Sequence, residues 1–405
     1  MDVYGGALRS RKRNTTSKGN ETLRFPLHDL NEDLLERVLS WLPTSSFLRL
    51  TSVCKRWKSV SHSAAFMLAC SQVPSRRPWF FMIDSHSHHQ QQPVVFDSDE
   101  GNWKKLNNPP PPLLPTTPIA AAGGLLCFLR PDGGFIVTNP VTATCCHIDP
   151  PSPAAAPQPI RAIAMAAKRK GFEIVLVSGE LPSLNFRVYT SLTQQWGEES
   201  SLTRKSGSGG GVDCAPYFLS KCGNVVTTNT QRSPSKQYSS ILIDGDGGGG
   251  KILYFLSSAG AVVACDLCGG SFFEYPRLLP VFSEYSIDLV ECGGRMWVVL
   301  LSEFLETASL RVWGWDEAGR CWKQAAAMPP CMSRELYGKK ADVNCAGGGG
   351  KVLVCVSSGE SCRYVMCDLG ENEWAELPQC SVDGRRREFV SAFSFEPRIE
   401  VDFTP

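Results

Sequence analysis

The feature of the sequence that most constrains its fold is a short pattern that recurs six times after residue 90. In each copy an apolar run ends in a short polar residue, and a large or sulfur-containing side chain follows six residues later. An Asp, Asn or Thr side chain there accepts hydrogen bonds from the backbone amides of a turn, and an aromatic residue favours the strand that follows. The pattern therefore predicts six β-hairpins, built on the pairs Asp97/Trp103, Asn139/Cys145, Thr190/Trp196, Asp266/Phe272, Asp316/Trp322 and Asp368/Trp374.

The spacing of these pairs indicates what each repeat contains. Their first members lie 42, 51, 76, 50 and 52 residues apart. A repeat of about 50 residues accommodates four short strands, which is the content of one blade of a β-propeller. The 76-residue interval is interpreted as one blade that is enlarged by the glycine-rich insertions at residues 206–211 and 245–250.

Glycine doublets before apolar runs give these repeats a kelch-like character, as at Gly123-Gly124 and Gly349-Gly350. A propeller ring commonly closes when a strand from one terminus completes a blade from the other, and we expect the apolar segment Phe389–Phe395 to do so. The prediction for residues 71–405 is an all-β kelch-like β-propeller of about six blades, with seven left open.

Residues 25–70 have a helical period instead. Pro43 ends the first expected helix, residues 44–46 can begin a second, and a third is expected through residues 60–68. Three helices in about 45 residues enclose only a small core, so an apolar face is left for a partner. The whole chain is thus predicted to be a multidomain α+β protein. The helical apolar stripes consist of Leu34, Leu35, Val38, Leu39 and Leu42, and of Phe47, Leu50, Val53, Cys54 and Trp57.

Residues 1–22 are expected to form a flexible basic tail. Its run Arg9–Arg13 is a candidate nuclear-import signal, with a plain solvated tail as the alternative. The tail does not resemble a secretory signal, and the longest nearly uncharged apolar run, residues 119–129, is shorter than the ~20 residues that cross a bilayer. The 17 cysteines are therefore interpreted as reduced side chains, and the expected location is the nucleus, the cytoplasm or both.

The sequence offers little material for catalysis or for a cofactor. Only His147 of the six histidines lies inside the repeats, which is too few imidazoles for a copper or zinc centre. Cys265 and Cys268 have Cys-x-x-Cys spacing without a second pair, and the histidine tract at residues 86–89 is better explained as a surface loop. We expect no catalytic residue, no metal and no cofactor. The net charge of +1 also argues against direct nucleic-acid binding, and no membrane association is expected.

The helical segment resembles the F-box domain. The residues that carry the resemblance are Leu30–Pro43, Phe47–Leu50, Val53-Cys-Lys-Arg-Trp57 and Phe66. The family pattern has a leucine–proline pair, a helix that ends in Leu-Pro, and a Val-Cys-Lys-x-Trp stretch. The match departs from that pattern at Asn31, where the family usually has proline. With the repeats that follow, the chain resembles the plant F-box/kelch-repeat proteins.

This resemblance implies a non-catalytic role in a Skp–cullin–F-box (SCF) ubiquitin ligase. The F-box would bind a Skp-type adaptor and, through it, a cullin, and the propeller would bind an unidentified substrate protein for ubiquitination and proteasomal degradation. Some of the F-box residues can alternatively belong to its own core, as Cys54 and Trp57 illustrate. The residues that the resemblance assigns to adaptor binding are Leu30, Leu34, Leu35, Leu42, Pro43, Leu50, Val53 and Trp57.

Two other functions are weighed against this one. The first is a nuclear interaction or transcription-cofactor scaffold that acts without degradation, which the basic run Arg9–Arg13 allows. The second is a propeller enzyme of the oxidase type, against which the histidine count argues.

Overall fold

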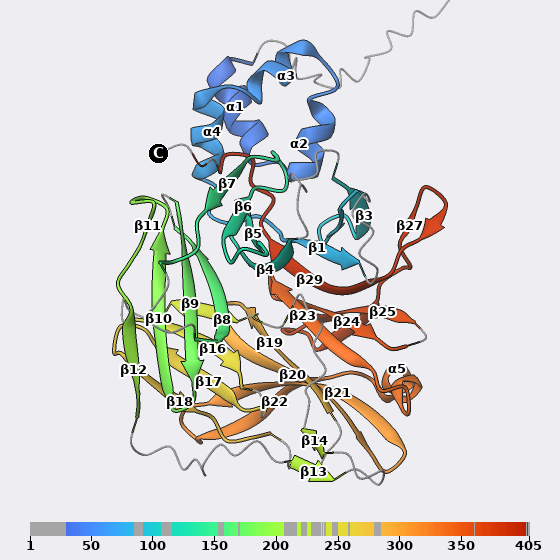
Figure 1. The fold of residues 1–405 in the computed structure, drawn as a ribbon. Coiled ribbons are helices and arrows are strands. Elements are labelled where there is room, and N and C mark those ends of the chain that lie inside the picture. Colours follow the sequence, from blue (N-terminus) through green and yellow to red (C-terminus); the bar gives the residue numbers. More distant parts are fainter. Residues whose placement is uncertain are drawn as a thin grey trace, which may run out of the picture.

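The computed structural model places a small helical unit at one end of a ring of β-sheets (Figure 1). The expected tail at residues 1–22, the histidine tract and the insertion at residues 206–211 lie outside the described residues. The structure describes residues 30–84, 92–106, 116–152, 158–168, 171–205, 217–219, 225–227, 236, 238, 240–244, 250–257, 260–278, 285–359, 361–401 and 403.

Residues 30–71, called the helical unit below, contain four helices where three were expected. The acidic residues Glu32 and Asp33 lie in the first turn of α1 and Arg37 in its last turn, which suits the helix dipole. The expected third helix is interrupted at Ser63, whose hydroxyl accepts a hydrogen bond from the Phe66 amide at 3.4 Å and so starts a new helix. The helices are α1 (Glu32–Ser40), α2 (Thr44–Leu50), α3 (Lys55–Val60) and α4 (Ala64–Ser71).

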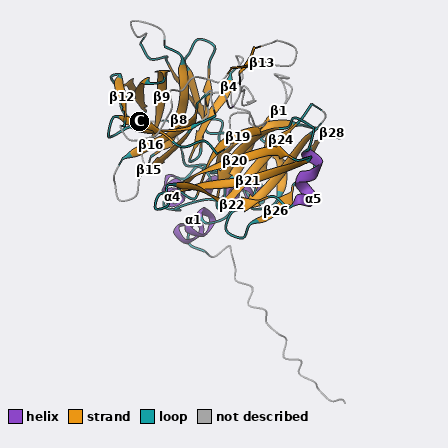
Figure 2. Cartoon of the chain, turned by 90° about the horizontal axis from the view of Figure 1, so that it is seen from below, coloured by secondary structure: helices purple, strands orange, loops and turns teal. Residues whose placement is uncertain are grey.

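Strands account for most of the remaining described chain (Figure 2). They form six blades within the described residues. Blade 1 contains β29 (Phe389–Phe395), β1 (Trp79–Asp84), β2 (Val94–Asp97) and β3 (Asn102–Lys105). Blade 2 contains β4 (Thr117–Ala122), β5 (Leu125–Leu129), β6 (Phe135–Thr138) and β7 (Cys145–Ile148). Blade 3 contains β8 (Ile160–Ala167), β9 (Phe172–Glu180) and β10 (Ser183–Thr190), with β11 (Gln195–Trp196) and β12 (Ser200–Arg204) beside β10.

The other three blades repeat this order. Blade 4 contains β15 (Ile241–Asp244), β16 (Lys251–Leu256), β17 (Val262–Asp266) and β18 (Ser271–Glu274). Blade 5 contains β19 (Tyr285–Cys292), β20 (Arg295–Phe304), β21 (Thr307–Asp316) and β22 (Cys321–Ala327), and blade 6 contains β23 (Asp342–Gly348), β24 (Lys351–Ser357), β25 (Cys362–Asp368) and β26 (Glu373–Glu376). The smaller elements are α5 (Pro330–Ser333), the 3₁₀ helix η4 (Arg334–Leu336), and the hairpins β13 (Tyr217–Leu219)–β14 (Val225–Thr227) and β27 (Ser381–Val382)–β28 (Arg385–Arg386).

The ring closes as expected, because the last strand of the chain pairs with the first. Strand β29 runs antiparallel to β1 and places Phe395 opposite Trp79. A parallel pairing of β12 with β18 additionally joins blades 3 and 4 into one nine-stranded sheet. The 76-residue interval therefore contains no seventh blade among its described residues.

All six predicted hairpins are confirmed, and each is the turn between the third and fourth strands of a blade. Asp97 ends β2 and its Oδ1 accepts from the amides of Asp99 and Glu100 at 2.9 and 3.2 Å. Asp266 and Asp368 accept in the same way from the amides three and two residues on. In these three blades the short polar side chain therefore shapes the turn, as the sequence pattern predicts.

Three aromatic members of the pairs donate a hydrogen bond to the preceding blade of the ring. The indole Nε1 of Trp103 donates to the carbonyl of Pro378 at 2.9 Å, across the junction from blade 1 to blade 6. Trp196 donates to Asp149 at 2.9 Å and Trp322 to Pro276 at 2.7 Å across two further junctions. These bonds join the outer strand of one blade to the end of the preceding blade.

The propeller core consists of six apolar clusters, each between two neighbouring blades of the described chain. Alternation along β1 shows how one strand serves two clusters. Phe80 and Met82 pack toward blade 6, whereas Trp79 and Phe81 pack toward blade 2. Every blade is therefore held by both of its neighbours.

Candidate adaptor-binding face

The first helix carries two adjacent apolar stripes, and only one of them is covered. Leu35 and Leu39 face the core of the helical unit and are 1% and 3% exposed. Leu34 and Val38, each one position earlier, are both 54% exposed, and Trp41 continues their stripe after the helix at 65% exposed. Residues four apart lie on one helix face, so the outer stripe is a continuous apolar line.

Exposed apolar side chains are concentrated in this unit. Ten large apolar side chains are exposed among the described residues, and six of them lie between residues 34 and 68. Leu48 in α2 and Val53 before α3 are two of these, and Pro43 before α2 is exposed as well. Concentrations of this kind mark protein-binding surfaces. The outer apolar set is defined here as Leu34, Val38, Trp41, Pro43, Leu48 and Val53.

The eight residues assigned by resemblance to adaptor binding fall into three groups. Exposed members are Leu34, Pro43 and Val53. Half-buried members that pack against the core are Leu30, Leu42, Leu50 and Trp57. Leu35 departs from the prediction, because a side chain that is 1% exposed packs the helix and does not reach a partner while the unit is folded.

Three members of the outer apolar set were missed as site residues by the sequence reasoning. The sequence pattern places Val38 on the same helix face as Leu39. In the structure these neighbours differ, because Leu39 is buried and Val38 is exposed. Trp41 follows the helix, and Leu48 lies one position after the buried Phe47. The available signal was that the apolar arc of α1 is wider than a small core can cover.

Local contacts hold the helices of the unit together. The rings of Phe47 and Phe66 stack with their centroids 4.7 Å apart and connect α2 to α4. Arg56 of α3 donates from Nη2 to the carbonyl of Leu30 at 2.6 Å, which holds the entrance to α1. Cys54 Sγ accepts from the Trp57 amide at 3.5 Å and caps α3.

A charged network joins the helical unit to the turn between β2 and β3. The carboxylate of Glu100 accepts from Ser45 Oγ at 2.7 Å and from Arg49 Nη2 at 2.5 Å, and it lies 2.9 Å from Lys104 Nζ. Hydrogen bonds from Lys104, Ser45 and Arg49 lower the pKa of Glu100 to about 2. The carboxylate is therefore ionised at neutral pH, and it fixes α2 against blade 1.

The metal and Cys-x-x-Cys alternatives can be checked among the described residues. No group of three or more His, Cys, Asp or Glu side chains in that part of the chain is arranged to hold a metal ion. Cys265 is buried in β17, where burial raises the pKa of its thiol to about 12, while Cys268 is exposed in the following turn. The described helices also lack the combination of length and apolar character that a membrane crossing requires.

Comparisons with known proteins bear on this site directly. Residues 27–68 match the family model of the F-box domain. Over 394 residues the chain is 48% identical to F-box only protein 13 of Arabidopsis thaliana, covering 93% of this chain and 85% of that protein. The chain belongs to the plant F-box proteins. The matched segment contains the whole outer apolar set.

Two further relatives of this F-box protein are also from Arabidopsis thaliana. F-box only protein 6 is 26% identical over 370 residues, which cover 89% of this chain and 71% of that protein. F-box/kelch-repeat protein At3g61590 is 48% identical over 54 residues, or 13% of either chain. An F-box domain implies binding to a Skp-type adaptor, and proteins of this family are typically non-catalytic adaptors.

Proposed function

We propose that the chain is the substrate-recognition subunit of an SCF ubiquitin ligase. The helical unit binds a Skp-type adaptor and, through it, a cullin, and the propeller binds a target protein that is ubiquitinated and then degraded. The observation that carries this proposal is the uncovered stripe Leu34, Val38 and Trp41 within the matched F-box domain. The chain makes and breaks no bond in this mechanism, because it acts by raising the concentration of the target near the ubiquitin-loaded enzyme.

The topology separates the adaptor end of the propeller from a free end. Trp79 and Phe395 are paired where the helical unit attaches, and the turns between first and second strands lie at that same end. Because the strands are antiparallel, the turns between second and third strands lie at the opposite end. We propose that the target binds at this free end, as loops there point away from the adaptor.

The free end carries an exposed apolar corner that is a candidate target contact. Phe304 and Leu305, at the β20–β21 turn, are 73% and 80% exposed. Both carboxylate oxygens of Glu303 accept from the amide of Gly338 at 3.2 Å, which ties this hairpin to the loop of the 44% exposed Tyr337. Exposed aromatic side chains on a fixed backbone are typical of binding hot spots.

The kelch class of the blades and the location of the chain belong to the same proposal. The doublets Gly293-Gly294 and Gly349-Gly350 occupy turns between first and second strands, with φ between +60° and +80°. This placement supports a kelch-like repeat. The basic run Arg9–Arg13 supports a nuclear location beside a cytoplasmic one.

The test is co-purification of the full chain with a Skp-type adaptor and a cullin. We expect the wild type to retain both partners and the double variant Trp41→Ala, Val53→Ala to lose them, because each substitution removes an exposed apolar contact from the helical unit. Leu192→Ala is the matched control, since Leu192 is 63% exposed on the propeller and lies outside the matched domain.

Two results would count against the proposal. Retention of the adaptor by the double variant would show that the outer apolar set is not the interface. Absence of the adaptor from the wild type would instead favour the scaffold that works without degradation.

A further inference from the structure

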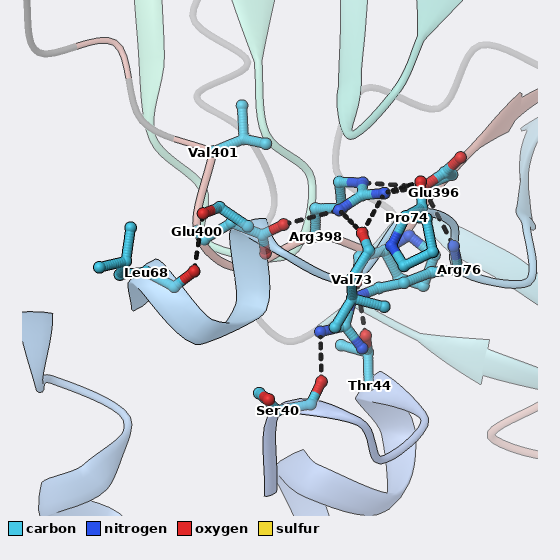
Figure 3. Close-up of polar contacts among 12 residues, drawn as sticks. Ser40, Thr44, Leu68, Val73, Pro74, Arg76, Glu396, Arg398, Glu400 and Val401 are labelled. Carbon is cyan, nitrogen blue, oxygen red and sulfur yellow. Dashed lines mark hydrogen bonds and ion pairs between the residues drawn. The ribbon is translucent and has the colours of Figure 1, made fainter. Parts of the chain in front are cut away.

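The last described residues of the chain pack against the first. Residues 396–401, called the C-terminal strap below, follow the closing strand β29 and run back to the helical unit (Figure 3). Ile399 packs against the core formed by Leu35, Leu39, Phe47, Val60, Phe66 and Cys70. That core has only six buried side chains, so one more apolar contact is a substantial fraction of it.

Polar contacts hold the strap to the helical unit. Thr44 Oγ1, at the first residue of α2, donates to the carbonyl of Pro397 at 2.5 Å. The guanidinium of Arg398 donates to the carbonyls of Val73 and Pro74, just after α4, at 3.2 and 3.1 Å. Arg398 is flanked by Glu396 at 2.6 Å and Glu400 at 2.9 Å, so its charge is balanced where it is half-buried.

A second arginine, Arg76, links the strap to the end of α1. Arg76 donates from its backbone amide to Glu396 Oε2 at 3.1 Å. Its guanidinium donates to the carbonyls of Ser40 and Leu42 at 2.9 and 3.0 Å, at the end of α1. A cation at this position suits the helix dipole and satisfies carbonyls that the helix leaves free. Those two carbonyls flank Trp41. Through Arg76, the strap therefore holds the backbone at the end of the outer stripe.

The other side of the strap is bound to the propeller. The Glu396 amide donates to the carbonyl of Gly123 in the β4–β5 turn at 2.5 Å. Asn139, in the β6–β7 turn, donates from Nδ2 to the carbonyls of Arg398 and Val401 at 2.8 and 3.1 Å. These turns belong to blade 2, whose neighbour, blade 1, contains the closing strand. The strap reaches this place only when β29 has closed the ring.

We infer that the C-terminal strap completes the adaptor-binding unit, so that the chain binds its adaptor fully only after the propeller has closed. This inference rests on the proposed function. Ile399 and Arg398 are its positioning residues: they act through the helical core and Arg76, and they do not touch the adaptor. A chain whose propeller has not closed would thus be kept from recruiting the ligase.

The experiment compares adaptor affinity and hydrogen exchange in four full-length or near-full-length chains: wild type, Ile399→Asp, Ile399→Val, and a chain that ends at Phe395. The probe is a purified Skp-type adaptor. We expect the shortened chain and Ile399→Asp to lose about tenfold or more in affinity, the loss that corresponds to about 1.4 kcal/mol of coupling. We expect Ile399→Val to bind within about twofold of wild type, because it keeps an apolar contact.

Hydrogen exchange separates this role from general unfolding. Amides of α1 and α4 should exchange faster in both weakened chains, while β20 and β24 keep their protection. If the shortened chain loses protection everywhere, Ile399→Asp decides the matter. Wild-type affinity in Ile399→Asp would overturn the inference and leave the proposed function intact, whereas no adaptor binding by the wild type would remove the proposed function itself.

Discussion

The side chain of Asp342 lies where burial disfavours its ionised form. It lies on the inner strand β23, where its oxygens accept from Ser286 Oγ at 2.6 Å and from Asn344 Nδ2 at 3.2 Å. Burial raises its pKa to about 6, and the nearby Asp288 adds to the shift. Asp288 itself is buried and lies 3.9 Å from Lys236 Nζ.

The shift predicts how Asp342 affects stability across pH. The folded chain binds the proton more tightly than the unfolded chain, so the stabilising contribution is complete below pH ~4 and is lost as pH rises through about 6. We expect Asp342→Asn to raise the melting temperature at pH 7.5 by a few degrees relative to wild type, and to give no gain at pH 4. Thermal unfolding at both pH values, followed by tryptophan fluorescence, measures this. An equal effect at both pH values would contradict it.

A single indole hydrogen bond should be measurable at the junction of blades 4 and 5. Replacing Trp322 by Phe keeps an aromatic ring but removes the donor to the Pro276 carbonyl. We expect a loss of about 1 kcal/mol, the usual net value of such a bond, together with some packing. Urea unfolding of Trp322→Phe against wild type gives the number. An unchanged midpoint would mean that water replaces the indole at no cost.

At the scale of elements, local chemistry made the hairpins predictable and long-range contacts made the site harder to predict. The side chains of Asp97 and Asp368 accept from amides two and three residues away, so their turns can be inferred from a short stretch of sequence. The closing strand was predictable because a propeller ring commonly closes with a strand from the other terminus, and Phe389–Phe395 is an apolar segment near the C-terminal end of the sequence. Which stripe of α1 stays exposed depends on α2 and α4, and Leu34 and Leu35 are equally apolar.

One glycine in blade 6 tests how tightly the inner strands pack. A Cβ at Gly347 would lie 2.0 Å from the carbonyl oxygen of Glu291 on the neighbouring blade. Gly347→Ala should therefore destabilise the propeller by about 1–3 kcal/mol, because backbone on one side must move. Gly359→Ala is the control, since a Cβ there meets no atom within 4 Å. Chemical denaturation of both variants measures the difference, and equal stabilities would show that the ring yields at this point.

At the scale of the whole molecule, the chain is joined end to end at one place. Thr44 and Pro397, which share a hydrogen bond, are 353 residues apart in sequence. No periodicity or motif encodes such a contact, which is why the C-terminal strap was beyond sequence reasoning. The Glu100 network lies at the same junction, and the two together fix how the helical unit is oriented on blades 1 and 2.

This arrangement predicts an acid-sensitive junction. The pKa of Glu100 is lowered to about 2, so the carboxylate stabilises the junction fully above pH ~4.5 and loses that effect as pH falls toward 2. Glu100→Gln should weaken the docking of the helical unit at pH 7 and make it nearly independent of pH between 4.5 and 2. Circular dichroism at 222 nm follows the helices, which lie mainly in this unit. Tryptophan fluorescence follows mainly the blades, which hold eight of the ten tryptophans, the other two being Trp41 and Trp57 of the helical unit. We expect the helical signal of the wild type to decline at a higher pH than the blade signal, and to be lost at a lower temperature in Glu100→Gln at pH 7. Coincident loss of both signals in both proteins would mean that the helical unit and the propeller unfold as one body.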